Sequence, residues 1–237
     1  MEICTGFVLK LSEYSDTLKI IHFYSREKGY ISMIAPTSIF KRRNKPVHLF
    51  QIVEIEYSVN NHGGLHHLKS ADTIKNLPNL YFDVIKMNIL LLWGEVLNLI
   101  LKNEEPNDAL YNFIINSIEY LNTSEEDTGN FNLFFLYRLS TFLGLRINTD
   151  SWQEDYLFSI ADGCFYPADR NSGCISGPNT ARTIHRICTC LTEELSNIPL
   201  NQSARNILID IIFIFYERHL NIHFNTKSIQ VIREIFK

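Results

Sequence analysis

Apolar and polar side chains alternate along Gln51-Ile52-Val53-Glu54-Ile55-Glu56-Tyr57, strictly so from Val53 onward. Successive side chains of a β-strand point to opposite faces, so this spacing predicts a strand with one buried and one exposed face. Four more stretches rich in Val, Ile, Phe and Tyr lie close by in the sequence. We therefore expect strands over residues 3–11, 18–24, 30–35, 49–57 and 65–69.

The breaks between these stretches carry residues that favour turns. They include Glu27-Lys28-Gly29, Pro36 and Asn60-Asn61-His62-Gly63-Gly64. Several short strands in so few residues suit a small closed barrel, because closure removes exposed sheet edges. An OB-fold is the common five-stranded barrel. The pattern alone also allows an SH3-like barrel.

Beyond Pro78 the spacing of apolar residues changes to three and four, which is the period of an amphipathic helix. Residues 150–178 lose this period and are rich in Gly and Pro, which indicates an irregular insert. The prediction is an α+β chain of two domains. They are an N-terminal five-stranded OB-fold β-barrel over residues 1–78 and an all-helical C-terminal domain over residues 79–237, with the insert at about 150–178.

Charge is divided unevenly along the chain. The 237 residues carry a net charge of −4, with 46% hydrophobic and 20% charged residues, which is typical of a globular protein and not of a disordered one. Residues 1–80 hold 10 Lys and Arg against 7 Asp and Glu, whereas residues 81–237 hold 12 against 19. This division suggests two functions in one chain, with any polyanion directed to the first part.

The sequence favours neither export nor membrane insertion. Its longest apolar runs, residues 89–101 and 207–215, are interrupted by Glu95 and Asp210, and we expect both to be too short to span a bilayer. The N-terminus lacks the basic start and apolar block of a signal peptide. Five cysteines without a framework spacing fit a reducing compartment. We therefore expect a cytoplasmic protein.

Motifs for catalysis and metal binding are also missing from the sequence. It contains no glycine-rich phosphate loop and no Gly-x-Ser-x-Gly elbow. Cys164 and Cys174 stand alone, ten residues apart, and Cys188 and Cys190 would point to different sides of a helix. Neither pair has the spacing of a zinc site. We therefore expect no enzymatic activity, no cofactor and no metal.

Positive charge is most concentrated between two predicted strands, in Lys41-Arg42-Arg43-Asn44-Lys45. Adjacent cations repel one another unless water or an anion lies close, and a phosphate backbone supplies anions at regular spacing. The alternative is a solvated basic loop. Further cations of the predicted barrel favour a nucleic-acid site: Lys10, Lys19, Arg26 and Lys28.

Aromatic side chains are interleaved with these cations, as in proteins that bind single strands by stacking their bases. We expect Phe7, Phe23 and Phe50 to fill the barrel. The stacking candidates lie near predicted turns and are Tyr14, Tyr30 and Phe40.

The order of these segments resembles that of the RecO family of bacterial recombination mediators. Near the N-terminus the likeness is carried by Ile3-Cys4-Thr5-Gly6-Phe7-Val8-Leu9-Lys10, Glu13-Tyr14-Ser15-Asp16 and Phe23-Tyr24-Ser25-Arg26-Glu27-Lys28-Gly29-Tyr30. Near the C-terminus it is carried by Tyr216-Glu217-Arg218-His219-Leu220 and by residues 226–235. The resemblance thus covers essentially the whole chain.

The resemblance implies binding of single- and double-stranded DNA, annealing of complementary strands, and loading of the RecA recombinase onto DNA coated by single-strand-binding protein. It implies two direct partners, RecR and the acidic C-terminal tail of single-strand-binding protein, and a nucleoid-associated location. Many members carry a four-cysteine zinc module in the insert, where this chain has only Cys164 and Cys174. Ser12 replaces a family glycine, and Pro36 would stiffen the loop that carries the basic run.

Other hypotheses stay open beside that of a DNA-binding mediator. The barrel could dock proteins only, as an interaction adaptor, and a nuclease would need clustered carboxylates that the sequence does not show. An acidic partner peptide would need a basic side chain beside an apolar groove. Five arginines of the acidic helical part are candidates, although each could instead be half of a surface ion pair: Arg138, Arg182, Arg186, Arg205 and Arg218.

Overall fold

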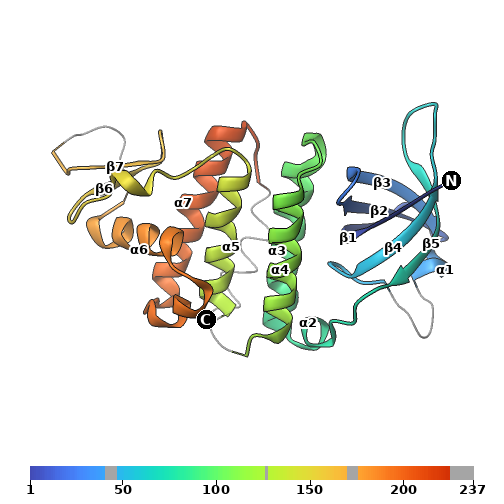
Figure 1. The fold of residues 1–237 in the computed structure, drawn as a ribbon, viewed down its shortest axis with the longest axis horizontal. Coiled ribbons are helices and arrows are strands. Elements are labelled where there is room, and N and C mark those ends of the chain that lie inside the picture. The colour runs from blue at the N-terminus through green and yellow to red at the C-terminus, as the bar shows by residue number, and fades with distance from the viewer. Residues whose placement is uncertain (41–46, 126–127, 170–175, 225–237) are drawn as a thin grey trace. The chain divides into compact units, whose positions relative to one another are not determined.

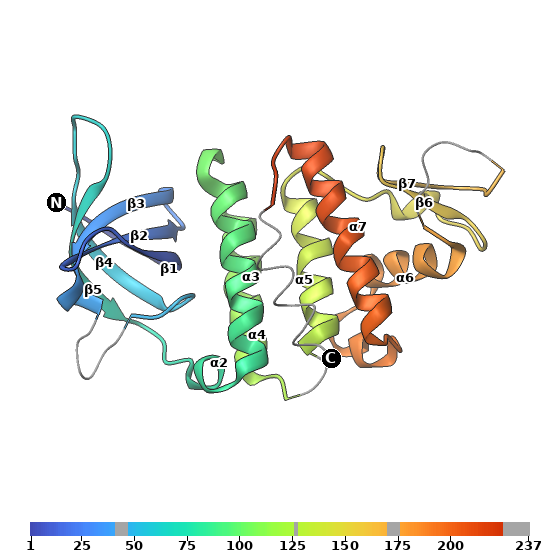
Figure 2. The ribbon, with the colours of Figure 1, turned by 180° about the vertical axis from the view of Figure 1, so that it is seen from behind.

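A computed structural model describes every residue of the chain except 41–46, 126–127, 170–175 and 225–237. The chain divides into two compact units, Met1–Asn122 and Thr123–Lys237. The first unit combines the barrel with helices, and the second is mainly helical (Figures 1 and 2). The predicted domain boundary at residue 78 falls inside the first unit, between its last strand and its first long helix.

The barrel consists of β1 (Glu2–Glu13), β2 (Leu18–Ser25), β3 (Gly29–Pro36), β4 (Ile52–Ser58) and β5 (His66–Thr73). The strands close in the order β1-β2-β3-β5-β4, with β4 paired to β1. The β3–β5 pair is parallel and the other pairs are antiparallel. This is the arrangement of an OB-fold. The predicted fold class is therefore confirmed, and the SH3-like alternative is removed.

The predicted fourth strand starts three residues later in the structure, at Ile52. Phe50 has a φ of 57°, a left-handed conformation that no strand residue adopts. Its backbone N–H still donates to the Val8 carbonyl oxygen at 2.7 Å. The chain therefore turns at Phe50 before it enters the barrel.

The interior of the barrel is apolar, and the alternation along β4 accounts for part of it. Val53, Ile55 and Tyr57 point inward, whereas Glu54 is exposed. A short helix, α1 (Thr37–Phe40), follows β3 and adds apolar side chains to the same core. The core consists of Cys4, Val8, Ile21, Phe23, Ile31, Met33, Ala35, Ile39, Phe40, Val47, Val53, Ile55, Tyr57, Leu68 and Ala71.

Strand β1 is buried on both faces over its middle part. Cys4 and Val8 belong to the barrel interior, yet Phe7 and Leu9 are also fully buried. The pairing of β1 with β2 shifts between Val8 and Lys10, so Leu9 is the extra residue of a β-bulge. Helix α3 (Val84–Ile100) lies over this point. A Cβ at Gly94 of α3 would meet the Leu9 carbonyl oxygen at 2.7 Å, so the close approach requires glycine there.

An aromatic cluster fills the space between the barrel and the helices of the first unit. The Phe7 ring lies 5.9 Å from the rings of both Phe50 and Tyr111, and Phe50 lies 6.3 Å from Trp93. Phe7 and Phe50 thus join the barrel to its helices, whereas Phe23 fills the interior as predicted. The helical elements of this unit are α2 (Pro78–Phe82), α3, η1 (Leu101–Asn103) and α4 (Asp108–Thr123).

Helix α3 is longer than the apolar run from which it was predicted. Together with η1 it spans Val84–Asn103, 20 residues that contain an 18-residue window with a mean hydropathy of 1.7, which by length and composition alone is enough to cross a membrane. This length belongs to the helix and not to the run at residues 89–101 from which the helix was predicted. Within its most apolar window, 56% is buried inside the protein, as in the core helices of globular proteins.

The second unit is built around three helices that pack against one another, α5 (Thr128–Phe142), α6 (Pro178–Thr189) and α7 (Gln202–Leu220). Figure 1 shows α5 and α7 side by side, and buried tyrosines join them. The hydroxyl of Tyr137 donates to the Leu208 carbonyl oxygen at 2.9 Å, and that of Tyr216 donates to the Leu136 carbonyl oxygen at 2.6 Å.

The insert contains regular structure that the sequence did not predict. Strands β6 (Leu157–Ser159) and β7 (Cys164–Tyr166) form a two-stranded antiparallel sheet next to α6. Two short 3₁₀ helices complete the unit, η2 (Thr149–Ser151) and η3 (Thr192–Asn197). Within its described residues, the regular structure of the C-terminal part is therefore helical apart from this small sheet.

Candidate nucleic-acid interface

The basic run at Lys41, Arg42, Arg43 and Lys45 lies outside the described residues. The nearest core residues on its two sides are Phe40 and Val47, which both pack in the barrel interior. The assignment of this run to DNA stays a prediction.

Three of the other four predicted cations contact acidic side chains. Lys19 Nζ lies 2.6 Å from a carboxylate oxygen of Glu13, and Lys28 Nζ lies 3.3 Å from one of Glu2. Arg26 donates to the side-chain oxygen of Asn112, lies 3.8 Å from Asp108, and stands over the ring of Tyr111 at 5.0 Å. Because a carboxylate offsets much of a neighbouring positive charge, these side chains are partly neutralised.

Lys10 differs from these three. It is exposed, and it forms no ion pair within the residues that the structure describes. The structure does not gather all four cations into one cluster, because Lys19 lies near the start of β2 and Arg26 follows its end. With about 3.3 Å per strand residue, these two backbone positions are roughly 20 Å apart.

The three stacking candidates have different surroundings. Tyr14 is 61% exposed in the turn between β1 and β2, so its ring is open to a base. The hydroxyl of Tyr30 donates to the side-chain oxygen of Asn98 at 2.8 Å, and its ring stacks on His22 at 5.8 Å. Phe40 is only 6% exposed and packs in the barrel core. This burial corrects the expectation for Phe40, because its ring has no open face for stacking.

The outer surface of the barrel is divided by charge. On β4 and β5, the outward side chains include Glu54, Glu56 and Asp72, and the register sets Glu54 opposite Asp72. On the neighbouring part of β1, β2 and β3, the outward positions hold Lys10, His22 and Ser32, and the register sets Lys10 opposite His22. A polyanion would be repelled by the first surface and accepted by the second.

His22 was not predicted as a site residue. Burial lowers its pKa from the usual value of 6.5, and the nearby charges of Lys10 and Lys102 lower it further. A single histidine on a predicted strand carries no functional signal in a sequence. Lys102 is likewise visible only in the structure, because it reaches this surface from η1, beyond the predicted barrel.

The five candidate arginines of the helical part are spread over three helices. Arg138 donates to the Cys188 carbonyl oxygen at 2.9 Å, Arg186 to that of Asn197 at 3.3 Å, and Arg205 to the Asn130 side-chain oxygen at 3.0 Å. Arg182 is bonded to the Glu154 carboxylate. Arg218 is exposed near the end of α7, with no ion pair or hydrogen bond within the described part of the chain.

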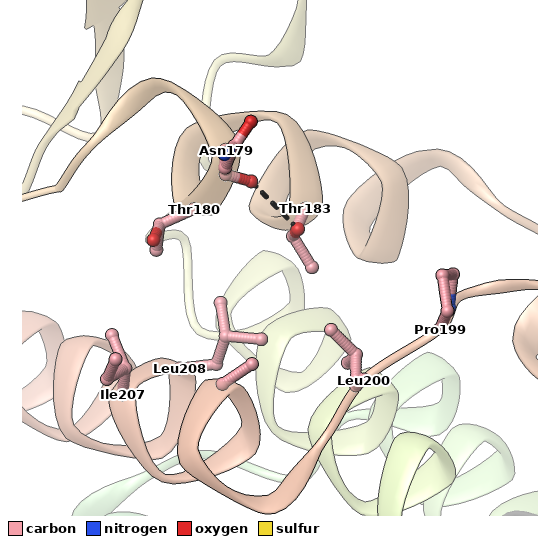
Figure 3. A pocket seen from close by; sticks show the side chains of 8 residues that line it. Asn179, Thr180, Thr183, Pro199, Leu200, Ile207 and Leu208 are labelled. Atoms are coloured by element: carbon pink, nitrogen blue, oxygen red, sulfur yellow. Dashed lines mark hydrogen bonds between the residues drawn. The ribbon is translucent and has the colours of Figure 1, made fainter.

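A pocket of about 240 Å³ lies between α6 and the start of α7 (Figure 3). Asn179, Thr180 and Thr183 of α6 form one wall, and the other walls are mainly apolar. Arg182 lies on the same helix and donates to the Asn179 side chain at 3.4 Å. An apolar pocket thus lies near a basic side chain. The remaining lining residues are Pro199, Leu200, Ala204, Ile207 and Leu208.

The cysteines do not assemble a metal site in the described part of the chain. Among those residues, no group of three or more His, Cys, Asp and Glu could hold a metal ion. Cys164 is a free thiol, and Cys174 lies outside the described residues. Burial raises the pKa of Cys188 to about 12 and that of Cys4 to about 11, so these thiols stay protonated and are poor ligands.

Comparison with known proteins accounts for nearly the whole chain. The family model described as recombination protein O N terminal matches residues 1–77, and the one described as recombination protein O C terminal matches residues 81–228. The DNA repair protein RecO of Phocaeicola vulgatus is 28% identical over 234 residues, which is 98% of this chain and 97% of the relative. That of Bacteroides fragilis is 28% identical over 236 residues, and that of Christiangramia forsetii 26% over 235, again with 98% and 97% coverage. This chain therefore belongs to the RecO family and has a role in DNA repair and recombination.

Proposed function

We propose that this protein is a recombination mediator without catalytic activity of its own. It binds single- and double-stranded DNA and anneals complementary strands. With RecR it helps to load RecA onto DNA coated by single-strand-binding protein. In this proposal the barrel holds phosphates, and the helical unit holds protein partners, including the acidic C-terminal tail of single-strand-binding protein.

The observation that carries the proposal is the OB barrel itself. The chain that contains it matches the RecO family models over both its N-terminal and its C-terminal domain. OB-folds bind oligonucleotides across their outer strands and loops. Here the outer surface of β1, β2 and β3 carries Lys10 and His22, and the basic run 41–45 belongs to the same part of the sequence. The proposed DNA contacts are Lys10, Lys19, Arg26, Lys28, Lys41, Arg42, Arg43 and Lys45, with Tyr14 and Tyr30 as stacking candidates.

The DNA site is tested by replacing Lys41, Arg42, Arg43 and Lys45 together with Ala. For each cation that binds a phosphate in the wild type, its removal should reduce the slope of log affinity against log salt by about 0.7 on single strands and about 0.9 on duplex DNA. Fluorescence anisotropy of labelled oligonucleotides over a salt series measures this slope. Lys75→Ala is the matched control, because Lys75 is paired with Glu119 at 2.7 Å and is not among the proposed contacts. An unchanged slope in the quadruple variant would remove these residues from the DNA site.

The mediator activity is tested in two further assays. Annealing is followed by the loss of single strands from a mixture of complementary labelled oligonucleotides. Loading is followed by the RecA-dependent ATP hydrolysis that appears on coated single strands when this protein and RecR are added. Binding of DNA without a gain in either assay would contradict the mediator proposal and leave DNA binding intact.

A second candidate function is a protein-interaction adaptor whose barrel docks proteins. The observation in its favour is that carboxylates partly neutralise Lys19, Arg26 and Lys28. If the protein is an adaptor, it should bind DNA weakly or not at all, with little dependence on salt, and it should still bind RecR. The same salt series therefore separates the two candidates.

For the partner tail we propose the pocket between α6 and α7, with Arg182 at its edge. An acidic peptide that ends in an apolar residue would place that residue in the pocket and its carboxylates near Arg182, whereas Arg138, Arg186, Arg205 and Arg218 remain alternatives. Ile207 lines the pocket and is 47% exposed, so Ile207→Glu should repel the peptide. Ile214→Glu is the matched control, because Ile214 lies on the same helix, is 43% exposed and does not line the pocket. Calorimetry with the peptide should show loss of binding in the first variant only.

A further inference from the structure

His22 lies at the centre of a polar network on the outer face of the barrel. Its Nδ1 is 3.0 Å from the Ser32 hydroxyl and 2.8 Å from the Tyr30 hydroxyl. Tyr30 in turn donates to Asn98 of α3 at 2.8 Å. These contacts fix the orientation of the ring through one nitrogen. The other nitrogen, Nε2, has no hydrogen-bond partner within the described residues.

Two lysines on separate elements lie close enough for their charges to act on this ring. Lys10 is the register partner of His22 on β1, and Lys102 belongs to η1, which packs against β3. Both are exposed, and neither forms an ion pair within the described part of the chain. The charges that act on His22 are those of the two lysines, and the groups bonded around it on β3 and α3 are the neutral Tyr30, Ser32 and Asn98. The nearby carboxylate is that of Glu95 on α3, which lines a pocket together with Lys10.

We propose that Lys10, His22 and Lys102 form a binding site for one phosphate of a DNA strand. The two ammonium groups hold the phosphate oxygens, and protonated His22 donates to one of them from Nε2. The inference rests on the proposed function, in which the barrel binds DNA. It adds His22 and Lys102 to the proposed DNA contacts. It also extends the proposed path of the DNA from the barrel strands onto η1, which belongs to the same unit.

An apolar pocket beside Lys10 makes a nucleotide strand a better occupant than a free phosphate ion. Besides Lys10 it is lined by Leu9, Leu11, Leu49, Leu91, Gly94 and Glu95, and its volume is about 260 Å³. A phosphate held at Lys10 would thus lie next to a surface that accepts a sugar or an unstacked base. Inorganic phosphate would gain nothing from that surface.

The site makes DNA binding depend on pH. In the free protein, burial and the two lysines keep the pKa of His22 below 6.5, so the ring is neutral at pH 7. The negative charge of a bound phosphate favours the imidazolium and raises this pKa, so binding takes up a proton from solvent. Affinity is therefore highest below the free pKa and is lost as the pH rises through the bound pKa. Within that window it changes by up to about tenfold per pH unit.

The experiment measures the affinity for labelled oligothymidylate by anisotropy from about pH 5.5 to about pH 8, with buffers of constant ionic strength. The wild type should bind more tightly as the pH falls. His22→Gln should abolish this dependence and weaken binding at the acidic end of the range. His67→Gln is the matched control, since His67 is an exposed histidine of β5, and it should keep the dependence.

A second variant tests the site independently, in case His22→Gln does not fold. Lys102→Gln changes an exposed side chain and should reduce the salt slope by about 0.7 on single strands. Equal pH dependence in wild type and His22→Gln, or an unchanged slope in Lys102→Gln, would overturn the site while DNA binding by the barrel stands. Failure of the wild type to bind the oligonucleotide at any pH would overturn the proposed function and the site with it.

Discussion

Several cations of the barrel and several arginines of the second unit are held by different kinds of partner, although Arg146 and Arg182 of the second unit are also paired with carboxylates, those of Asp150 and Glu154. In the barrel, Lys19 and Lys28 are paired with the carboxylates of Glu13 and Glu2. In the second unit, Arg138 and Arg186 donate to backbone carbonyl oxygens, and Arg205 donates to an amide oxygen. A carbonyl oxygen orients a guanidinium without cancelling its charge, whereas a carboxylate cancels it.

This difference reverses the conclusion that the charge count alone suggests. Residues 1–80 carry the excess of Lys and Arg, yet much of that charge is already balanced inside the barrel. Residues 81–237 are acidic overall, yet Arg138 and Arg186 form no ion pair within the described residues and donate to carbonyl oxygens instead. Net charge by segment therefore indicates where polyanions are attracted at long range, and local pairing decides which side chains can bind them.

The largest effect should come from the neutral partner of Arg205. Asn130 is 1% exposed, accepts from Arg205 at 3.0 Å, and donates to the carbonyl oxygens of Leu195 and Ile198 at 3.0 and 2.9 Å. Asn130→Ala removes all three hydrogen bonds at a buried position and should lower the free energy of unfolding by about 3 kcal/mol. Urea denaturation measures this change. Asn179→Ala, at an exposed position, is the control and should cost well under 1 kcal/mol (about 0.5).

The next effect concerns the lysines that carboxylates neutralise. Replacing Glu2 and Glu13 with Gln should free Lys28 and Lys19 and increase the affinity for single-stranded DNA by about fivefold for each lysine that then reaches a phosphate. Anisotropy at fixed salt measures the gain. If both variants bind DNA as the wild type does, these two lysines lie away from the DNA path.

A smaller effect is expected when a barrel ion pair is removed. Lys19→Ala breaks the contact with Glu13, whose side chain is 71% exposed. Because exposed ion pairs are weak and screened by salt, the loss of unfolding free energy should stay below about 1 kcal/mol and vanish at high salt. Thermal unfolding in low and high salt measures it. A salt-independent loss would mean that Lys19 acts through the packing of its methylene stem.

The smallest effect is on the acid stability of the first strand. The hydrogen bond from Tyr57 and the contact with Lys28 lower the pKa of Glu2 below the usual 4.5. A carboxyl whose folded pKa is lowered contributes stability above its unfolded pKa and loses it as the pH falls through the folded pKa. Unfolding midpoints measured below pH 4.5 should therefore fall less steeply in Glu2→Gln than in the wild type. Equal slopes would contradict this role.

Local patterns predicted most of the fold. All five strands were located by alternation and turn residues, although β5 runs to Thr73, four residues past its predicted end. The start of β4 was misplaced, since the left-handed backbone of Phe50 has no marker in the sequence. Strands β6 and β7 were missed because three residues are too few to show a period.

The site was less predictable, because its properties depend on contacts between residues far apart in sequence. Phe40 stands next to the basic run, and only the position of α1 in the barrel shows that its ring is buried. Lys102 is 80 residues from His22 and reaches it through the packing of η1 on β3. Neither the period of apolar residues nor the spacing of a motif predicts contacts between residues so far apart in the sequence.

The closure of the barrel between β3 and β5 has a consequence for its dynamics. The parallel pairing of β3 with β5 contains two residue pairs, Met33 with His66 and Ile34 with His67. Every other pair of neighbouring strands in the barrel is joined by more residue pairs. The free energy of local opening should be lowest there, so amide hydrogens along this seam should exchange with solvent before those between β1 and β2. A barrel that opens at one defined line exposes two strand edges, to which an extended segment of another chain can pair without global unfolding.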